Sequence, residues 1–136
     1  MTANDIHRTA IGNIALLQKR KIGFLASRKI ATLSVLPTLD WATEISQRED
    51  VAVVSGFHSQ MEKEVLKILL RGKCGIIVIL ARGMYRQVPK YYEEALRQNR
   101  LLLLSYEKDN IIRISEQTAH KRNERVVSLS DEMKQI

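Results

Sequence analysis

The stretch 51–83, VAVVSGFHSQMEKEVLKILLRGKCGIIVILARG, predicts the fold of this chain. It opens with a short β-branched run, and Ser55-Gly56 ends that run where a strand must turn sharply into a helix. Apolar residues then recur at helical spacing over 62–71, and Gly72 follows at the position where a left-handed residue commonly ends a helix. The unbroken apolar run 75–80 is typical of a parallel strand covered on both faces. The stretch therefore predicts a βαβ unit.

The composition of the whole chain is consistent with a folded α/β domain. Its 136 residues fit one domain, since domains commonly have roughly 100 to 200 residues, and a hydrophobic content of 45% supports a core. Because aromatic residues make up only 5%, that core must rest on Ile, Leu and Val, which suits a buried parallel sheet. The single cysteine, Cys74, cannot form an internal disulfide, and we expect it to pack as a small hydrophobe.

Charge and hydropathy indicate where the chain works and what it binds. The formal net charge of +7 favours a polyanionic partner, and nucleic acid is the first candidate. The N-terminal segment 1–10 has no apolar signal core, and no window approaches the ~18 uncharged apolar residues of a membrane span. We therefore expect a cytoplasmic protein that does not bind membranes.

The flanking segments predict further helices and strands around the central unit. The expected elements are a helix over about 3–19 with Asn4 or Asp5 as N-cap, a strand over 22–26, a helix with Pro37 in its first turn that runs to about Gln47 with Leu36 facing inward, a short helix over 90–99, a strand over 101–104, an edge strand or loop over 111–114, and a last helix capped by Ser115 and Thr118. We see no linker, repeat or low-complexity tract. The sequence predicts a single domain, 1–136, with a three-layer Rossmann-like α/β fold and a mostly parallel sheet flanked by helices.

Motifs for catalysis, cofactors and metals are absent. The chain has no G-x-G-x-x-G or G-x-x-x-x-G-K-[ST] phosphate loop, no H-E-x-x-H and no paired cysteines. Its three histidines lie on different units, and no histidine and carboxylate are placed to activate a serine. Glu62 and Glu64 are expected to be solvated helix residues. We therefore predict no catalytic residues, no metal and no cofactor.

Serine, glycine and arginine recur directly after the predicted strands. These pairs are Ser27-Arg28, Ser55-Gly56 and Arg82-Gly83, and Ser105 follows the fourth strand. In a parallel sheet these loops lie side by side, where hydroxyls, N–H groups and an arginine can hold a phosphate. Arg28 and Arg82 are the strongest candidates, because each follows a strand directly. Serine and glycine are also ordinary turn residues, so a purely structural role for each loop stays open.

The same residues resemble a known family. The segments FLASRK from Phe24, VVSGF from Val53, IVILARGM from Ile77, LLLS from Leu102 and RNERVVSLS from Arg122 come in the order and spacing of the DNA-processing protein A (DprA/Smf) family. The resemblance covers about 22–131. It implies the Rossmann-like core of that family, within a wider nucleotide-binding (lysine decarboxylase-like, SLOG) superfamily. It further implies single-stranded DNA binding, self-association and a recombinase partner during DNA uptake.

The resemblance and the strand-end loops together give one set of candidate site residues. By position, the family's G-S-R loop, S-G turn, third-strand loop and R-N-R helix fall on residues of this chain that could contact nucleic acid or phosphate. The candidates are Ser27, Arg28, Lys29, Ser55, Gly56, Arg82, Gly83, Ser105, Lys121, Arg122, Asn123 and Arg125. The basic run 121–125 could equally be a solvated helix face.

Three functions are compatible with the sequence. The first is a non-enzymatic protein that binds single-stranded DNA through phosphate contacts, with a homodimer and a recombinase partner expected. The second is a sensor domain for a small nucleotide, and the third is a structural protein that assembles through its sheet edge.

Overall fold

The central unit folds as its sequence predicts. In the computed structural model, which describes residues 8–136, β3 (Val51–Ser55) leads through α2 (Gln60–Leu70) into β4 (Gly75–Leu80), and the two strands pair in parallel. A capping box begins α2, because the hydroxyl of Ser59 accepts the N–H of Glu62 while the Glu62 side chain accepts the N–H of Ser59.

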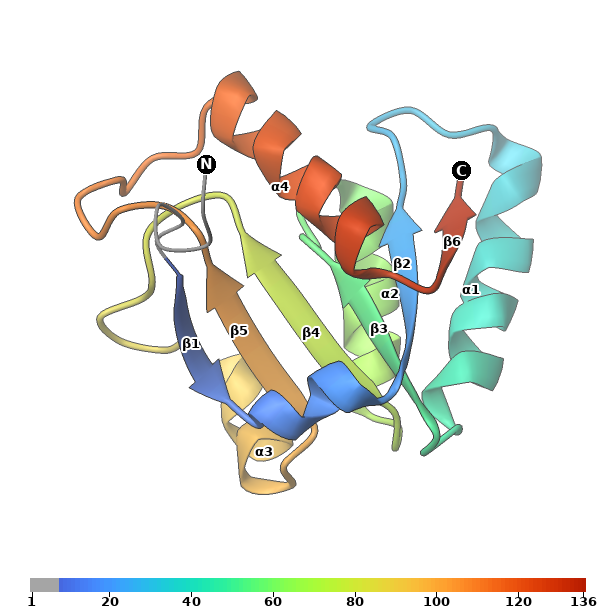
Figure 1. Ribbon diagram of the computed structural model, residues 1–136. Coiled ribbons are helices and arrows are strands. Elements are labelled where there is room, and N and C mark those ends of the chain that lie inside the picture. Colours follow the sequence, from blue (N-terminus) through green and yellow to red (C-terminus); the bar gives the residue numbers. More distant parts are fainter. Residues whose placement is uncertain (1–7) are drawn as a thin grey trace.

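Six strands form one sheet in the order β1-β5-β4-β3-β2-β6 (Figure 1). The other strands are β1 (Thr9–Gly12), β2 (Arg20–Leu25), β5 (Leu101–Ser105) and β6 (Glu132–Gln135), and only β1 runs antiparallel to its neighbour. One face is covered by α1 (Thr32–Ser46), α2 and α3 (Glu93–Arg97), which follows the 3-10 helix η3 (Lys90–Tyr92). The other face carries the 3-10 helix η2 (Ile14–Gln18) and α4 (Glu116–Leu129). The predicted three-layer α/β architecture is confirmed.

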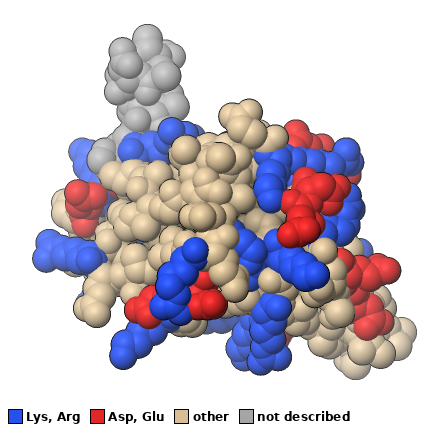
Figure 2. Space-filling view, turned by 90° about the horizontal axis from the view of Figure 1, so that it is seen from below, with Lys and Arg blue, Asp and Glu red and all other residues tan. Residues whose placement is uncertain are grey.

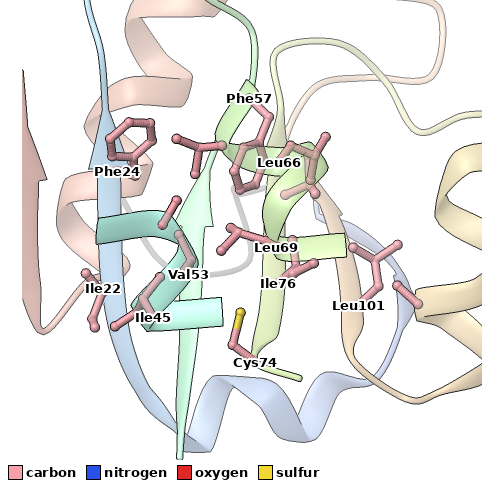
Figure 3. Packing of buried hydrophobic residues seen from close by; sticks show 14 of the residues in the cluster. Ile22, Phe24, Ile45, Val53, Phe57, Leu66, Leu69, Cys74, Ile76 and Leu101 are labelled. Carbon is pink, nitrogen blue, oxygen red and sulfur yellow. The ribbon is translucent and has the colours of Figure 1, made fainter. Parts of the chain in front are cut away.

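Alternating side chains of the strands fill a core on each face of the sheet. Val53 and Ile76 pack in the core beneath α1 and α2 (Figure 3). Their neighbours Val54 and Ile77 belong to the core on the other face, with residues of η2 and α4. Cys74 packs among the aliphatic side chains of the first core, and burial raises the pKa of its thiol to about 11. The thiol therefore stays protonated and packs as the sequence predicts.

The expected first helix is wrong over 9–12, and of its described residues only Ile14–Gln18 is helical, as the 3-10 helix η2. Residues 3–7, with the expected N-caps Asn4 and Asp5, lie outside the described residues, but β1 occupies 9–12 and pairs with β5. Gly12 lies in the left-handed region at a φ of 114°, and a Cβ there would approach the Leu101 carbonyl oxygen to 2.2 Å. Helical spacing of apolar residues is a local signal, and here a distant strand decides the conformation.

Three further expectations need correction. Helix α1 begins at Thr32, so Pro37 lies inside it and Leu36 is exposed rather than buried. Gly72 does follow α2, but its φ is not left-handed; instead, a Cβ would meet the Ser46 carbonyl oxygen at 2.3 Å. Strand β6 pairs in parallel with β2 where no strand was expected, while 111–114 is a loop, one of its two expected alternatives. Within residues 8–136, no helix has the length and apolarity needed to cross a membrane.

Candidate functional site

The carboxyl ends of four neighbouring parallel strands meet at one edge of the sheet. The chain leaves β2, β3 and β4 toward the helices of one face, whereas the loop 106–115 after β5 passes to α4 on the other face (Figure 1). Open α/β sheets bind their ligands in the crevice that such diverging connections create. The four strand-end loops therefore lie side by side, as the sequence predicts.

Two adjoining cavities open at this edge, and we call them together the groove. The polar basin, of about 660 Å³, lies between the loop after β2 and the N-terminal ends of α2 and α4, and contains Ser27, Arg28 and Asn123. The apolar basin, of about 540 Å³, extends from Arg82 along β4 between α2 and η3. His58, Ile114 and Arg122 line both basins.

Arg122 is a buried cation at the junction of the basins. The residue is only 6% exposed, and its side chain packs on Gly56, where a Cβ would lie 2.3 Å from Cδ and 2.4 Å from Nε. Nε donates to Oδ1 of Asn123 at 3.1 Å, but neither terminal nitrogen has a hydrogen-bond partner among the described residues. Burial lowers the pKa of Arg122 from its ordinary value, which the nearby carboxylate of Glu62 partly offsets. Arg122 therefore offers unsatisfied donors to an anion in the groove.

Glu62 connects two loops of the groove through hydrogen bonds. The expectation that it would be a solvated helix residue is wrong. It is 4% exposed; Oε2 accepts the N–H of Ala26 at 3.0 Å, and Oε1 accepts those of His58 at 2.8 Å and Ser59 at 3.2 Å. The carboxylate thus ties the end of β2 to the turn before α2. The S-x-x-E spacing of Ser59 and Glu62 was the signal in the sequence that could have identified this role.

Arg28 and Arg82 flank Arg122 on opposite sides. Arg28 is exposed at the polar basin. Arg82 lines the apolar basin, where its guanidinium lies 4.9 Å from the centre of the Tyr85 ring and Nε donates to the carbonyl of Gly83 at 3.1 Å. The three arginines thus follow one path across the ends of the strands.

Two of the predicted serines and one glycine contact the backbone of the strand-end loops and do not line either basin. Ser55 is buried and its hydroxyl accepts the N–H of Phe57 at 3.0 Å. Ser105 is also buried and donates to the carbonyl of Arg82 at 2.5 Å. At Gly83 the backbone passes so close to Lys108 that a Cβ would lie 2.5 Å from its carbonyl oxygen. These residues fix the backbone at the strand ends.

The predicted basic residues divide between two surfaces. Lys121 and Arg125 lie on the side of α4 away from the groove, where Arg125 sits 4.0 Å from the centre of the Tyr106 ring. Lys121 and Arg125 are four residues apart and therefore share one side of the helix. Lys29 is exposed and lines neither basin, while its carbonyl accepts the hydroxyl of Ser27 at 3.0 Å.

The two ends of the molecule differ in how their charges are balanced. Figure 2 shows the end opposite the groove, where basic and acidic side chains are interspersed. Arg48 pairs with Asp50 and Arg97 pairs with Glu94. Among the described residues, none of the groove's three arginines forms an ion pair. None of these three arginines is therefore neutralised by a direct ion pair among the described residues, although the Glu62 carboxylate lies near Arg122.

Comparisons with known proteins identify relatives of the chain. Residues 8–134 match the family model of DNA recombination-mediator protein A. DNA processing protein A (DprA) from Streptococcus pneumoniae superposes with a TM-score of 0.73 at 16% identity, covering 94% of this chain and 45% of that one. The Helicobacter pylori DprA structure, which describes that protein's single-stranded DNA binding mode, gives 0.71 at 18% identity, covering 94% and 59%. The chain thus spans about half the length of these structures. No curated protein matches it in sequence.

Proposed function

Because the chain belongs to the DNA recombination-mediator protein A family, we propose that it binds single-stranded DNA in the groove and acts in DNA recombination or uptake. The observation that carries the proposal is Arg122, a buried guanidinium whose terminal nitrogens have no partner among the described residues. A cation in this state is costly unless an anion completes it, and phosphate is the anion of every nucleic acid.

The arrangement of the groove supports contact with a phosphate backbone rather than with one isolated anion. Arg28, Arg122 and Arg82 follow one another in space along the strand ends, and Lys63 adds a further cation beside the apolar basin. Planar guanidinium groups bind phosphate oxygens in pairs but do not read bases from there. The expected affinity is therefore sensitive to salt and largely independent of sequence.

The proposal includes no catalysis, because binding and presenting DNA needs no bond to be broken. It also includes self-association. Leu33 and Leu36 are 90% and 67% exposed on α1, and β6 forms a sheet edge next to it. Exposed apolar side chains beside an open strand favour a contact with a second copy. A recombinase is the partner that a recombination mediator would serve.

A small nucleotide is the second candidate ligand, and the apolar basin favours it. Its volume of about 540 Å³ lies within the roughly 300–1,000 Å³ of small-molecule sites.

The proposal is tested by titrating labelled single-stranded DNA and following fluorescence anisotropy at several salt concentrations. The wild type should bind with a logarithmic affinity that falls linearly with the logarithm of salt concentration. Arg122→Ala, Arg28→Ala and Arg82→Ala should each weaken binding and reduce the salt slope by about 1. Arg97→Ala, at the exposed site of the Glu94 ion pair, is the matched control. A folded wild type that binds no DNA at low salt would contradict the proposal.

A further inference from the structure

Two of the predicted basic residues, Lys121 and Arg125, take no part in the groove. They line a separate open cleft of about 290 Å³ on the other side of α4, which we call the outer cleft. Its remaining lining residues are Glu124 and Ser128. None of these four residues lines the polar or the apolar basin. Phosphate binding in the groove therefore does not account for the two cations.

The ring of Tyr106 holds the guanidinium of Arg125 at the outer cleft. The guanidinium carbon lies over the ring, 4.0 Å from its centre, and the half-buried ring packs against the core on the α4 face of the sheet. An arginine stacked on an aromatic ring keeps its N–H groups available to an anion. Because this contact already orders the side chain, binding an anion costs less conformational entropy than it would at an unsupported surface arginine.

Cations outnumber carboxylates around the outer cleft. The side chains of Lys121 and Arg125 form no hydrogen bond or ion pair among residues 8–136. Glu124 is the only carboxylate that lines the cleft, and water screens its charge because its side chain is 67% exposed. The exposed Arg8 adds a third cation, since the antiparallel pairing of β1 with β5 brings it to the same end of those strands as Tyr106.

We propose that Tyr106, Lys121 and Arg125 form a second contact surface for a nucleic acid backbone, outside the groove. A phosphodiester suits this surface, because a guanidinium binds its oxygens in pairs and can stack a neighbouring base on its free face. The inference goes beyond the proposed function, since none of these residues lines the groove. Only α4, a helix about 10–12 Å wide with its side chains, separates the two surfaces.

The phosphodiester in the outer cleft can come from two sources. The strand that fills the groove can continue across the N-terminal turns of α4, or a second strand can bind on its own. In the first case the additional contact is intramolecular, so long strands gain affinity that short strands lack. In the second case one protein chain holds two strands at once.

The test uses labelled thymidine oligomers of two lengths in anisotropy titrations. One has about 6 nucleotides and the other about 30, near the lower limit and above the upper limit of known single-strand site sizes. The variant is Lys121→Gln/Arg125→Gln. Its charge-matched control is Arg48→Gln/Arg97→Gln, which removes two cations at the opposite end of the molecule. Lys121→Gln alone is a second variant, at an exposed position, that keeps the contact between Arg125 and its tyrosine.

The double variant should bind the long oligomer about tenfold more weakly, with a salt slope reduced by about 1.4, because two phosphate contacts are lost. Lys121→Gln alone should reduce the slope by about half as much, and the control should bind as the wild type does. If one strand makes both contacts, the short oligomer binds the double variant and the wild type equally. If a second strand occupies the outer cleft, the wild type binds two short oligomers per chain and the double variant binds one.

Equal affinity, salt slope and stoichiometry in the double variant and the wild type would overturn the inference and leave these cations to an acidic protein partner. The inference is also overturned if the charge-matched control loses as much affinity as the double variant. Failure of the proposed function is a separate result, in which Arg122→Ala binds both oligomers as well as the wild type does. A folded wild type that binds neither oligomer would contradict both.

Discussion

The contact between Gly56 and Arg122 determines the shape of the groove. Any side chain at Gly56 would overlap the Arg122 side chain, with a Cβ 2.3 Å from Cδ. We expect Gly56→Ala to displace the guanidinium and lower the affinity for single-stranded DNA about tenfold, with a loss of about 1–3 kcal/mol in the free energy of unfolding. Anisotropy titration and urea unfolding measure the two effects.

The matched control for this substitution is Gly72→Ala. Gly72 is equally crowded, against the Ser46 carbonyl oxygen at 2.3 Å, but lies at the C-terminal end of α2, away from the groove. The Gly72→Ala variant should have a lower free energy of unfolding but the same affinity for single-stranded DNA as the wild type. Equal losses of affinity in both variants would show that the effect of Gly56→Ala comes from general destabilisation.

His58, which lines both basins, is expected to make the folding stability depend on pH. Burial, with the positive charges of Arg122 and Lys63, lowers the pKa of His58 below its ordinary value of 6.5, against a smaller opposing effect of Glu62. The folded state therefore binds this proton less readily than the unfolded state. The stability contributed by neutral His58 is present above the unfolded pKa and is lost as the pH falls through and below it.

The expected result is a fall in the urea midpoint between about pH 7.5 and pH 5 that is smaller in His58→Gln than in the wild type. His120→Gln is the control, because the His120 side chain is 78% exposed on the outer surface of α4. An identical pH profile in the wild type and His58→Gln would contradict this account of His58.

At the scale of elements, Arg100 connects the end of α2 to the start of β5. Its Nη1 donates to the carbonyls of Leu69 at 3.2 Å and Cys74 at 2.8 Å, and its Nη2 donates to that of Leu70 at 2.8 Å. The last carbonyls of a helix have no hydrogen-bond donor within the helix, and the Arg100 guanidinium donates to those at the end of α2. Arg100→Ala should lower the free energy of unfolding by about 1–3 kcal/mol.

Urea unfolding checks this prediction, with Arg97→Ala as the comparison. Arg97 lies on the neighbouring α3 and its ion pair with Glu94 is exposed, so its loss should change stability by less than about 0.5 kcal/mol. Similar effects of the two substitutions would indicate that the carbonyl contacts of Arg100 contribute little.

Elements with strong local signals were the ones that the sequence predicted well. The strand 75–80 is continuous and apolar, and the cap at Ser115 is confirmed as a capping box with Thr118. The prediction of a first helix was wrong because residues 9–12 pair with β5, about 90 residues away in the chain. The secondary-structure preference of a short segment contains no information about so distant a partner. The strand β6 was missed for the same reason, since its four residues pair with β2 and have little apolar pattern.

The sequence predicted which edge of the sheet gathers the candidate residues, but not the contacts that hold them there. The order of parallel strands brings Arg28, Arg82 and Arg122 to one edge, and their positions after strands or in the family motif identified them. Burial of Arg122 and the three N–H groups gathered by Glu62 depend on how α4 and α2 pack, which no local pattern encodes. The apolar basin is likewise formed by segments far apart in the sequence.

On the scale of the whole molecule, the groove's three arginines form no ion pair among the described residues, whereas Arg48 and Arg97 at the opposite end are ion-paired. The return of the chain through α4 creates the groove, because it brings Arg122 over the ends of strands whose own helices lie on the other face (Figure 1). A net charge of +7 acts at a distance to attract a polyanion, and we expect that polyanion to bind in the groove. The groove is therefore the location at which we expect DNA to bind.

The most direct test of that location is a backbone-amide chemical-shift titration of the isotope-labelled chain with a short thymidine oligomer. The segments that we expect to shift are 26–28, 55–60, 81–85 and 114–123. These changes should saturate together and reverse when salt is added, because phosphate contacts carry the binding. Shifts centred on 48–50 and 94–98, with the groove's amides unchanged, would contradict the account by placing the DNA at the opposite end of the molecule.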